Sequence, residues 1–334
     1  MIVSVVAAVR RECAAIESFL DSVAAQDVAG VEWEVIVADG MSDDGTRGIL
    51  DRRAGEWPRL TVIDNPRLIA ATGLNAAIRQ ARGDVIVRMD AHTEYAPDYL
   101  RQCLAVLERT GAENVGGPAQ TRANGSVQRA MAAAFHSPFA SGGAKFHNPE
   151  YEGPVDTVPY GCWRRTTLEQ VGLFDETLAH NQDDELNLRI IRSGGRVWQS
   201  PRIRSWYRPR GTLRALLAQQ FRYGFWKVAV IRKHGRAGSW RPFAPAAAVF
   251  VGLCLALLAP FAEWALITLG VSAGAWLIAG VVSSVAAARR HGWDLLPLLP
   301  PVFAIYQLAY GAGFLMGTAA DAARPRATPG HLFR

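Results

Sequence analysis

The chain has 334 residues, half of them hydrophobic, so it can form one sizeable domain and a second part that need not face water. Lys and Arg outnumber Asp and Glu by 36 to 30, and the formal charge of +6 favours an anionic partner: nucleic acid, phospholipid or a phosphorylated substrate. The four cysteines are widely spaced without a CxxC pair, which argues against a zinc site or a disulfide framework and favours a reducing compartment.

The first hundred residues alternate between short apolar runs and helical patterns. Strands are predicted at IVSVVAAV, WEVIVADG, LTVIDN and DVIVRMDA, with helices around 13–25, 46–54 and 71–81. Such alternation indicates a parallel α/β sheet. The N-terminal apolar run precedes the first arginines, unlike the order in a secretory signal, so we expect this domain to stay in the cytoplasm.

Polar residues follow the predicted strands, at the carboxyl ends where open sheets bind ligands. Arg10 follows the first strand and Asp39 ends the second. A carboxylate at Asp39 can accept a hydrogen bond from a base N–H or a ribose hydroxyl. The surrounding loop, ADGMSDDGT, is also typical of an Asx-type turn that caps the next helix through Asp44 or Thr46.

The fourth strand leads into Asp90 and His92, which flank one alanine. Such a pair supplies one oxygen and one nitrogen ligand to a divalent ion. The alternative is a strand-end carboxylate beside a hydrogen-bonded histidine, which is the commoner meaning of an isolated DxH tripeptide. The position after a buried strand favours the metal site.

Residues 123–159 are rich in Gly, Ser, His and Asn, and we interpret them as a long loop of functional or mobile character. Further on, Asp183, Asp184 and Glu185 precede an apolar helical pattern, where negative charge stabilises a helix start. That acidity can be purely structural. A carboxylate near a cleft can also take the proton from an incoming hydroxyl.

A basic amphipathic stretch follows Tyr207. Its apolar positions recur every four residues, at Leu213, Leu217, Phe221 and Phe225, among arginines and lysines. This pattern suits an anionic membrane surface, although an ordinary surface helix has similar spacing. Within it, Arg222 could pair with a diphosphate and Tyr223 could stack on a sugar.

Three uncharged apolar segments, 243–262, 264–284 and 295–316, are each about long enough to cross a bilayer as a helix. Basic residues precede Arg241 and recur around Arg289, which places both regions in the cytoplasm by the positive-inside rule. Prolines near the start of the third segment also allow it to be re-entrant.

The chain therefore divides into four expected parts. They are a cytoplasmic catalytic domain at 1–207, a basic interfacial segment at 208–241, a transmembrane region at 242–320 and a tail at 321–334.

Taken in order, DGMSDDGT, the strand ending in DAH, GLFDETL followed by QDDELNLR, and QQFRY resemble the family 2 inverting glycosyltransferases. The resemblance covers roughly 2–233. It implies the GT-A fold, an α/β architecture with a Rossmann-like mixed sheet and flanking helices, here followed by a helical transmembrane region. The DAH form and the apolar tail are most similar to bacterial transferases of succinoglycan-type exopolysaccharide assembly, which lengthen a lipid-linked sugar on the cytoplasmic face of the inner membrane.

The resemblance also implies roles for individual residues. Asp183 corresponds to the general base, and Asp90 and His92 to the site of a divalent metal, Mn²⁺ or Mg²⁺. Nucleotide-sugar contacts are implied for Arg10, Glu12, Asp39, Asp44 and Asp90, and acceptor or diphosphate contacts for Asp184, Gln219, Arg222 and Tyr223. The chain departs from the family pattern at His92, Gln182 and Tyr223, where the family has aspartate, glutamate and tryptophan.

The implied function is transfer of a sugar from a nucleotide-diphosphate sugar, a UDP-sugar, to a hydroxyl of a lipid-linked oligosaccharide, with other polysaccharide-assembly proteins as partners. One alternative is a polyprenyl-phosphate sugar transferase, whose acceptor needs no strong base. Another is a non-catalytic, membrane-bound scaffold that binds nucleotide sugars. Nucleic acid explains the charge less well, because the arginines concentrate next to the hydrophobic tail.

Overall fold

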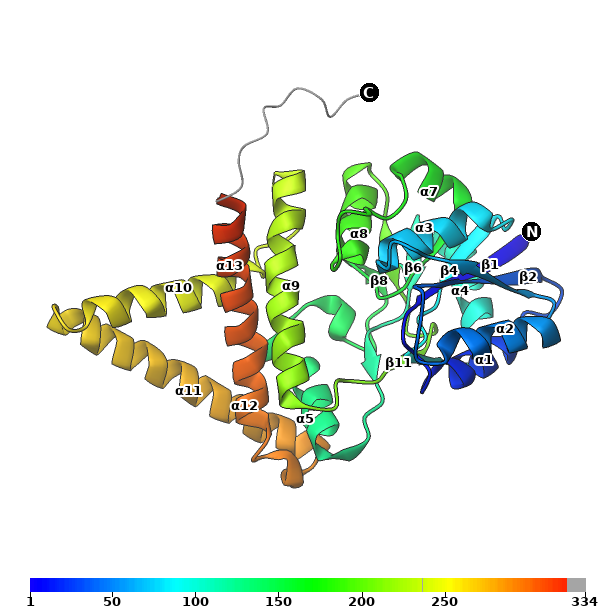
Figure 1. Cartoon of the computed structure of the whole chain (residues 1–334). Helices are drawn as coiled ribbons and strands as arrows, with labels where there is room; N and C mark the ends of the chain where they lie inside the picture. The colour runs from blue at the N-terminus through cyan, green and yellow to red at the C-terminus, as the bar shows by residue number, and fades with distance from the viewer. Residues whose placement is uncertain (236, 323–334) are drawn as a thin grey trace. The chain divides into compact units, whose positions relative to one another are not determined.

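The computed structural model describes residues 1–235 and 237–322, which divide into two compact units, Met1–Pro209 and a second unit beginning at Arg210 (Figure 1). In the first unit the described residues form an eight-stranded sheet in the order β3-β2-β1-β4-β9-β6-β10-β8. Its strands are β1 Ile2–Val9, β2 Glu32–Asp39, β3 Leu60–Asp64, β4 Val85–Arg88, β6 Asn114–Gly116, β8 Gly153–Pro154, β9 Cys162–Arg164 and β10 Val197–Gln199.

The four strands from β3 to β4 are mutually parallel, as predicted, and β9 runs antiparallel between β4 and β6. In this register Val9, Asp39 and Asp64 are direct neighbours. The loops after β1, β2 and β3 therefore meet at one edge of the sheet. A smaller sheet joins β5 Thr93–Tyr95, β11 Ser205–Tyr207 and β7 Gln120–Thr121.

Helices cover both faces of the large sheet, as Figure 1 shows. One face packs on α1 Ile16–Ala24, α2 Thr46–Glu56 and α4 Tyr99–Thr110, and the other on α3 Ala70–Gln80, α7 Arg165–Val171 and α8 Gln182–Arg192. Alternation along β1 explains the two cores. Val3 and Val5 point into the first, whereas Val6 points into the second. The mixed α/β sheet with flanking helices is confirmed.

The predicted long loop at 123–159 is wrong in part. The structure has a full helix there, α5 Gly125–Phe135, followed by α6 Pro138–Ser141 and a 3-10 turn, η1 Lys145–His147. Alanine and methionine have high helix propensity, and Ala130, Met131 and Ala134 bury one face of α5. Their run outweighed the Gly, Ser and Asn around it.

The second unit is helical. Its elements are α9 Leu213–His234, α10 Phe243–Leu258, α11 Glu263–His291, the 3-10 turn η2 Trp293–Leu295, α12 Leu299–Ala304, the π-helical turn η3 Ile305–Ala309 and α13 Tyr310–Ala322. Within the described part of the chain, two helical stretches are long and apolar enough to cross a membrane, Glu263–His291 and the continuous Leu299–Ala322. This confirms a C-terminal helical region with membrane-spanning length.

The first of the three predicted segments is shorter than expected. Helix α10 has 16 residues and ends at Leu258, so it rises about 24 Å, less than the ~30 Å hydrocarbon core. Pro260 explains the end, because a proline has no backbone N–H and cannot donate the next helical hydrogen bond.

Helix α9 packs along α13 through glycines. A Cβ at Gly313 would overlap the carbonyl oxygen of Phe221, and one at Gly224 would overlap the carbonyl oxygen of Tyr310. At Gly317 a Cβ would lie 2.6 Å from the Phe225 oxygen. Gly313 and Gly317 are four residues apart, the spacing that lets two helix backbones approach closely in lipid. One face of α9 is therefore buried against an apolar helix.

Replacing Gly313 with leucine should separate α9 from α13, because backbone atoms cannot rotate out of the way. We expect a loss of about 1–3 kcal/mol in unfolding free energy, measured by thermal unfolding of the full chain in detergent. Gly270→Leu on α11 is the matched control, because nothing lies within 4 Å of its Cβ position. Equal stability of the two variants would contradict this packing account.

Candidate active site

Two loops at the carboxyl edge of the sheet are joined by hydrogen bonds. Backbone N–H groups after β1 donate to side chains after β2: Arg11 to Ser42 at 2.9 Å, Glu12 to Thr46 at 2.9 Å and Cys13 to Asp44 at 3.1 Å. Asp44 also accepts from the Thr46 N–H at 3.1 Å and its hydroxyl at 2.6 Å. The expected Asx-type turn is therefore present, but the N-cap of α2 is Gly45 and not Asp44 or Thr46. These hydrogen bonds lower the pKa of Asp44, the Thr46 hydroxyl contributing most.

Asp39 lies beside this loop pair with only 1% of its surface exposed. Its carboxylate accepts from the Ser42 N–H at 3.2 Å and lies 3.8 Å from the Arg47 guanidinium. The exposed Arg10 lies over Gly40, the next residue, leaving a Cβ there only 3.1 Å from the Arg10 Cβ. The structure thus brings Arg10, Asp39 and Asp44 to the same pair of loops.

The centre of the first unit holds three charged residues. The Arg88 guanidinium donates to both carboxylate oxygens of Asp90, each at 2.8 Å, and also forms an ion pair with Asp183. Only 9% of the Arg88 side chain is exposed, against 15% for Asp90 and 32% for Asp183. The predicted metal carboxylate and the predicted base therefore share one buried cation.

These neighbours move the pKa of each carboxylate differently. Burial raises the pKa of Asp90, but the adjacent Arg88 charge outweighs burial and holds it below its ordinary value. For Asp183 burial dominates and raises the pKa to about 6, with Arg88 opposing and Asp90 and Asp184 adding to the rise. Asp183 is thus poised to exchange a proton near neutral pH.

The three acids at the start of α8 have separate surroundings. Asp183 meets Arg88, whereas Glu185 is fully buried and pairs with Arg189 at 2.8 Å. Arg189 also donates to the main-chain carbonyls of the loop before α8, at Val171, Gly172 and Leu173. Asp184 stays partly exposed beside Asp183. Glu185 is therefore structural, which leaves the two aspartates as the predicted site residues of this cluster.

Two buried tyrosines support the chain around Asp90. The Asp90 N–H donates to the Tyr95 hydroxyl at 2.6 Å, and the Tyr160 hydroxyl lies 2.6 Å from that of Thr93. The two rings meet edge to face with centroids 5.8 Å apart. Burial raises the pKa of both tyrosines, so they remain neutral. These two hydroxyl contacts hold the backbone around Asp90 in place.

His92 lies at the exposed side of this cluster. Its Nδ1 lies 3.8 Å from a Glu12 carboxylate oxygen, and its ring meets Tyr207 edge to face at 5.6 Å. Among the residues that the structure describes, no group of three or more His, Cys, Asp or Glu could hold a metal by itself. The oxygen of Asp90 suits Mn²⁺ or Mg²⁺, which commonly take their other ligands from water and a diphosphate, whereas the nitrogen of His92 is more typical of softer divalent ions.

Strained backbone gathers around the same edge. Five non-glycine residues of the described chain have positive φ, and they are Arg11, Met41, Leu68, Tyr160 and Asn181. They lie after β1, β2 and β3, before β9 and before α8 respectively. Conformations of this kind cost energy and concentrate at functional sites.

Sequence reasoning missed Arg88 and Asn75. The Asn75 side chain donates to the Phe174 carbonyl at 2.8 Å and accepts from the Phe174 N–H at 3.0 Å, tying α3 to the loop that leads into α8. A charge inside the apolar run VIVRMD was the available signal for Arg88. The other predicted residues, Gln219, Arg222 and Tyr223, lie on α9 of the second unit, where Gln219 donates to the Tyr223 hydroxyl at 3.0 Å.

Comparison with known proteins identifies the family. Residues 4–172 match the model of glycosyl transferase family 2. The succinoglycan biosynthesis protein ExoA of Rhizobium meliloti is 33% identical over 282 residues, which cover 84% of each protein. The chain belongs to glycosyl transferase family 2. It is therefore a glycosyltransferase, as the resemblance in its motifs predicted.

Two further relatives extend the comparison. A dolichyl N-acetyl-alpha-D-glucosaminyl phosphate 3-beta-D-2,3-diacetamido-2,3-dideoxy-beta-D-glucuronosyltransferase of Methanococcus voltae is 26% identical over 216 residues, 62% of this chain and 67% of that protein. The mannosyltransferase PcManGT of Pyrobaculum calidifontis, solved with GDP-Man and Mn²⁺, matches with a TM-score of 0.57 at 24% identity, covering 94% of this chain and 86% of that one. This likeness confirms the predicted GT-A fold.

The pKa of Asp183 predicts a pH dependence for transfer. A general base accepts a proton only when ionised, and the pKa of Asp183 is raised to about 6. We therefore expect kcat/KM, which reports the free enzyme, to fall as pH drops through about 6 and to level off above about 7. Steady-state assays from about pH 5 to 8 would measure this. A profile without that acidic limb would contradict the assignment.

Proposed function

We propose that this glycosyltransferase is membrane-bound, metal-dependent and inverting. It moves a sugar from a nucleotide-diphosphate sugar, a UDP-sugar, to a hydroxyl of a lipid-linked oligosaccharide in exopolysaccharide or cell-envelope glycan synthesis. The observation that carries the chemistry is the half-buried Asp183 carboxylate, with its raised pKa, which shares the Arg88 guanidinium with Asp90 at the carboxyl edge of the sheet.

The reaction is a single displacement. Asp183 takes the proton of the acceptor hydroxyl while that oxygen attacks the anomeric carbon, and the bond from this carbon to the diphosphate oxygen breaks on the opposite face. Asp90 and His92 would hold a divalent cation, which would neutralise negative charge on the departing diphosphate. The resemblance assigns Arg222 a contact with the same leaving group.

Donor binding falls to the loops after β1 and β2. Asp39 is buried where β2 ends, so its carboxylate is a fixed acceptor for the base or ribose. Arg10 lies over Gly40 in the loop after β2, and the Glu12 carboxylate lies 3.8 Å from His92, so both residues lie between Asp39 and the proposed metal site. The position agrees with the general rule that open α/β sheets bind nucleotides at the carboxyl ends of their strands.

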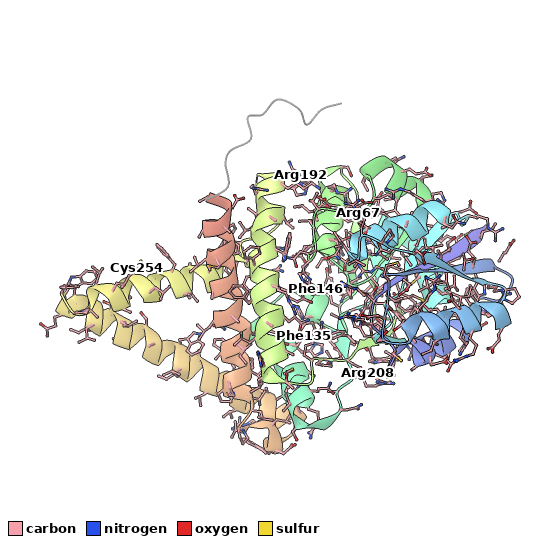
Figure 2. All side chains as sticks on the ribbon, viewed as in Figure 1. Arg67, Phe135, Phe146, Arg192, Arg208 and Cys254 are labelled. Carbon is pink, nitrogen blue, oxygen red and sulfur yellow. The ribbon has the colours of Figure 1, made fainter. Side chains whose placement is uncertain are left out.

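Exposed apolar side chains support attachment to a membrane. Large hydrophobic residues of α10, α11 and the turn between them are widely exposed, including Leu257 at 73%, Phe261 at 87% and Val271 at 68%. Figure 2 shows side chains standing out along both helices, with Cys254 labelled on α10. Water does not tolerate a continuous apolar surface of this kind, whereas lipid does.

The ends of these helices support an orientation. Three tryptophans are exposed near them, Trp240, Trp264 and Trp293, as in the aromatic belts of membrane proteins. Helix α11 begins at Glu263 and ends in Arg289 and Arg290. We infer that it crosses the inner membrane with its basic end in the cytoplasm, together with the basic end of α9 and the catalytic unit.

The relatives support the acceptor and the pathway class. One is named as a succinoglycan biosynthesis protein, and the other is named for transfer to a sugar held on dolichyl phosphate. The first name supports a role in polysaccharide synthesis, and the second supports a lipid-linked sugar as the acceptor of this chain.

The test is transfer from a panel of labelled nucleotide sugars to lipid-linked acceptors, using membranes that contain the full chain. Washing the membranes with about 1 M salt removes proteins held by surface charge alone, because salt screens such attraction. We expect metal-dependent transfer from one donor in the washed membranes. Asp183→Asn should lower kcat by on the order of 100-fold or more while donor binding persists.

Glu169→Gln is the matched control, because Glu169 is exposed on α7, away from the residues assigned to the site. It should transfer like the wild type. Transfer that tolerates Asp183→Asn would favour a polyprenyl-phosphate acceptor, which needs no strong base. Donor binding without transfer to any acceptor would favour a scaffold that binds nucleotide sugars.

A further inference from the structure

Arg88 occupies an unusual place for a charged residue. It is the last residue of β4, in a strand whose other residues are apolar and buried. Its backbone N–H donates to the Gly161 carbonyl at 3.0 Å, and its guanidinium lies 5.8 Å from the centre of the Phe174 ring. The backbone of Arg88 is thus fixed by the sheet, and its guanidinium lies against an aromatic ring.

The guanidinium joins two segments that are 95 residues apart in sequence. Its Nε and one terminal nitrogen grip the two oxygens of Asp90, and the other terminal nitrogen contacts Asp183. Burying a cation is costly unless it is paired with good geometry, and here both partners are acidic residues of the proposed site.

This geometry leaves Arg88 little capacity to touch a substrate. Each of its three nitrogens already contacts a carboxylate, and only 9% of the side chain reaches solvent. An arginine that bound the diphosphate would have to direct its N–H donors towards solvent, where the substrate binds. Arg88 presents them to Asp90 and Asp183, so any effect on transfer must pass through those two residues.

We propose that Arg88 is a positioning residue that fixes the Asp183 carboxylate relative to Asp90. The inference rests on the proposed function, in which Asp183 takes the acceptor proton and Asp90 belongs to the metal site. Arg88 sets the direction of the base and its separation from the diphosphate. Displacing a reacting group by about 1 Å can cost on the order of 100-fold in rate.

Only an arginine can hold this arrangement. The planar guanidinium presents donors in a fixed fork that grips one carboxylate with two bonds while a third reaches another. A lysine ammonium keeps the charge but is a compact point with flexible donors. The two replacements of Arg88 therefore separate charge from geometry.

The experiment compares Arg88→Gln, Arg88→Lys, Asp183→Asn and the double variant Arg88→Gln with Asp183→Asn in the full chain. We expect Arg88→Gln to lower kcat on the order of 100-fold and to weaken Mn²⁺-dependent donor binding, measured by calorimetry, by a smaller factor, because the variant releases the Asp90 carboxylate as well as that of Asp183. Arg88→Lys should keep the fold and still lose about tenfold in kcat.

The double variant shows whether Arg88 acts through the base. Where Asp183 is already asparagine, loss of Arg88 should cost less than about threefold more, because there is no base left to orient. Losses that multiply, or an Arg88→Lys enzyme with wild-type kcat, would overturn the inference. If Arg88→Gln does not fold, the lysine variant decides the outcome alone.

Arg165→Gln is the matched control for loss of a partly buried arginine. The Arg165 side chain donates to main-chain carbonyls at the other end of β4, among them those of Gly83 at 2.8 Å and Ala81 at 2.6 Å. It should lower thermal stability and leave kcat unchanged. Absence of transfer by the wild-type protein would refute the proposed function itself. An active Asp183→Asn enzyme would refute Asp183 as the base. Both outcomes can be distinguished from a result that refutes only the positioning role of Arg88.

Discussion

Burying charge is the constraint on which the catalytic unit depends. A guanidinium and two carboxylates leave water together at the carboxyl edge of the sheet, and each is tolerable only because the others are present. The parallel register brings the loops there, and Tyr95 and Tyr160 support the chain around Asp90. The same burial that makes this cluster costly gives Asp183 a pKa suited to taking a proton.

Much of the first unit could be predicted from the sequence, because the buried strands of a parallel sheet are continuous apolar runs that are easy to recognise. Apolar runs ending in Asp39 and before Asp90 located both strands and both loops. Arg88 escaped prediction because its partners include Asp183, far along the chain, and strand periodicity says nothing of such pairing. The acids at the start of α8 looked alike in sequence, and only burial against Arg189 separates Glu185 from its neighbours.

The misjudged segments have local physical causes. Helix α5 was not predicted because the glycine, serine and asparagine residues around it suggested a loop. The alanine-rich run inside it forms a helix with one buried face. Helix α10 ends early because Pro260 follows it closely. The close approach of α9 and α13 was not foreseen, since glycine spacing at Gly313 and Gly317 becomes meaningful only when the partner helix is known.

The proposed chemistry determines the anomeric configuration of the product. A single displacement by a hydroxyl that Asp183 activates inverts the anomeric carbon, whereas a double displacement through a covalent sugar intermediate retains its configuration. The measurement is the anomeric configuration of the new linkage, by NMR of the product formed from an α-linked donor. A β-linked product is predicted, and an α-linked product would contradict the assignment of Asp183 as the base.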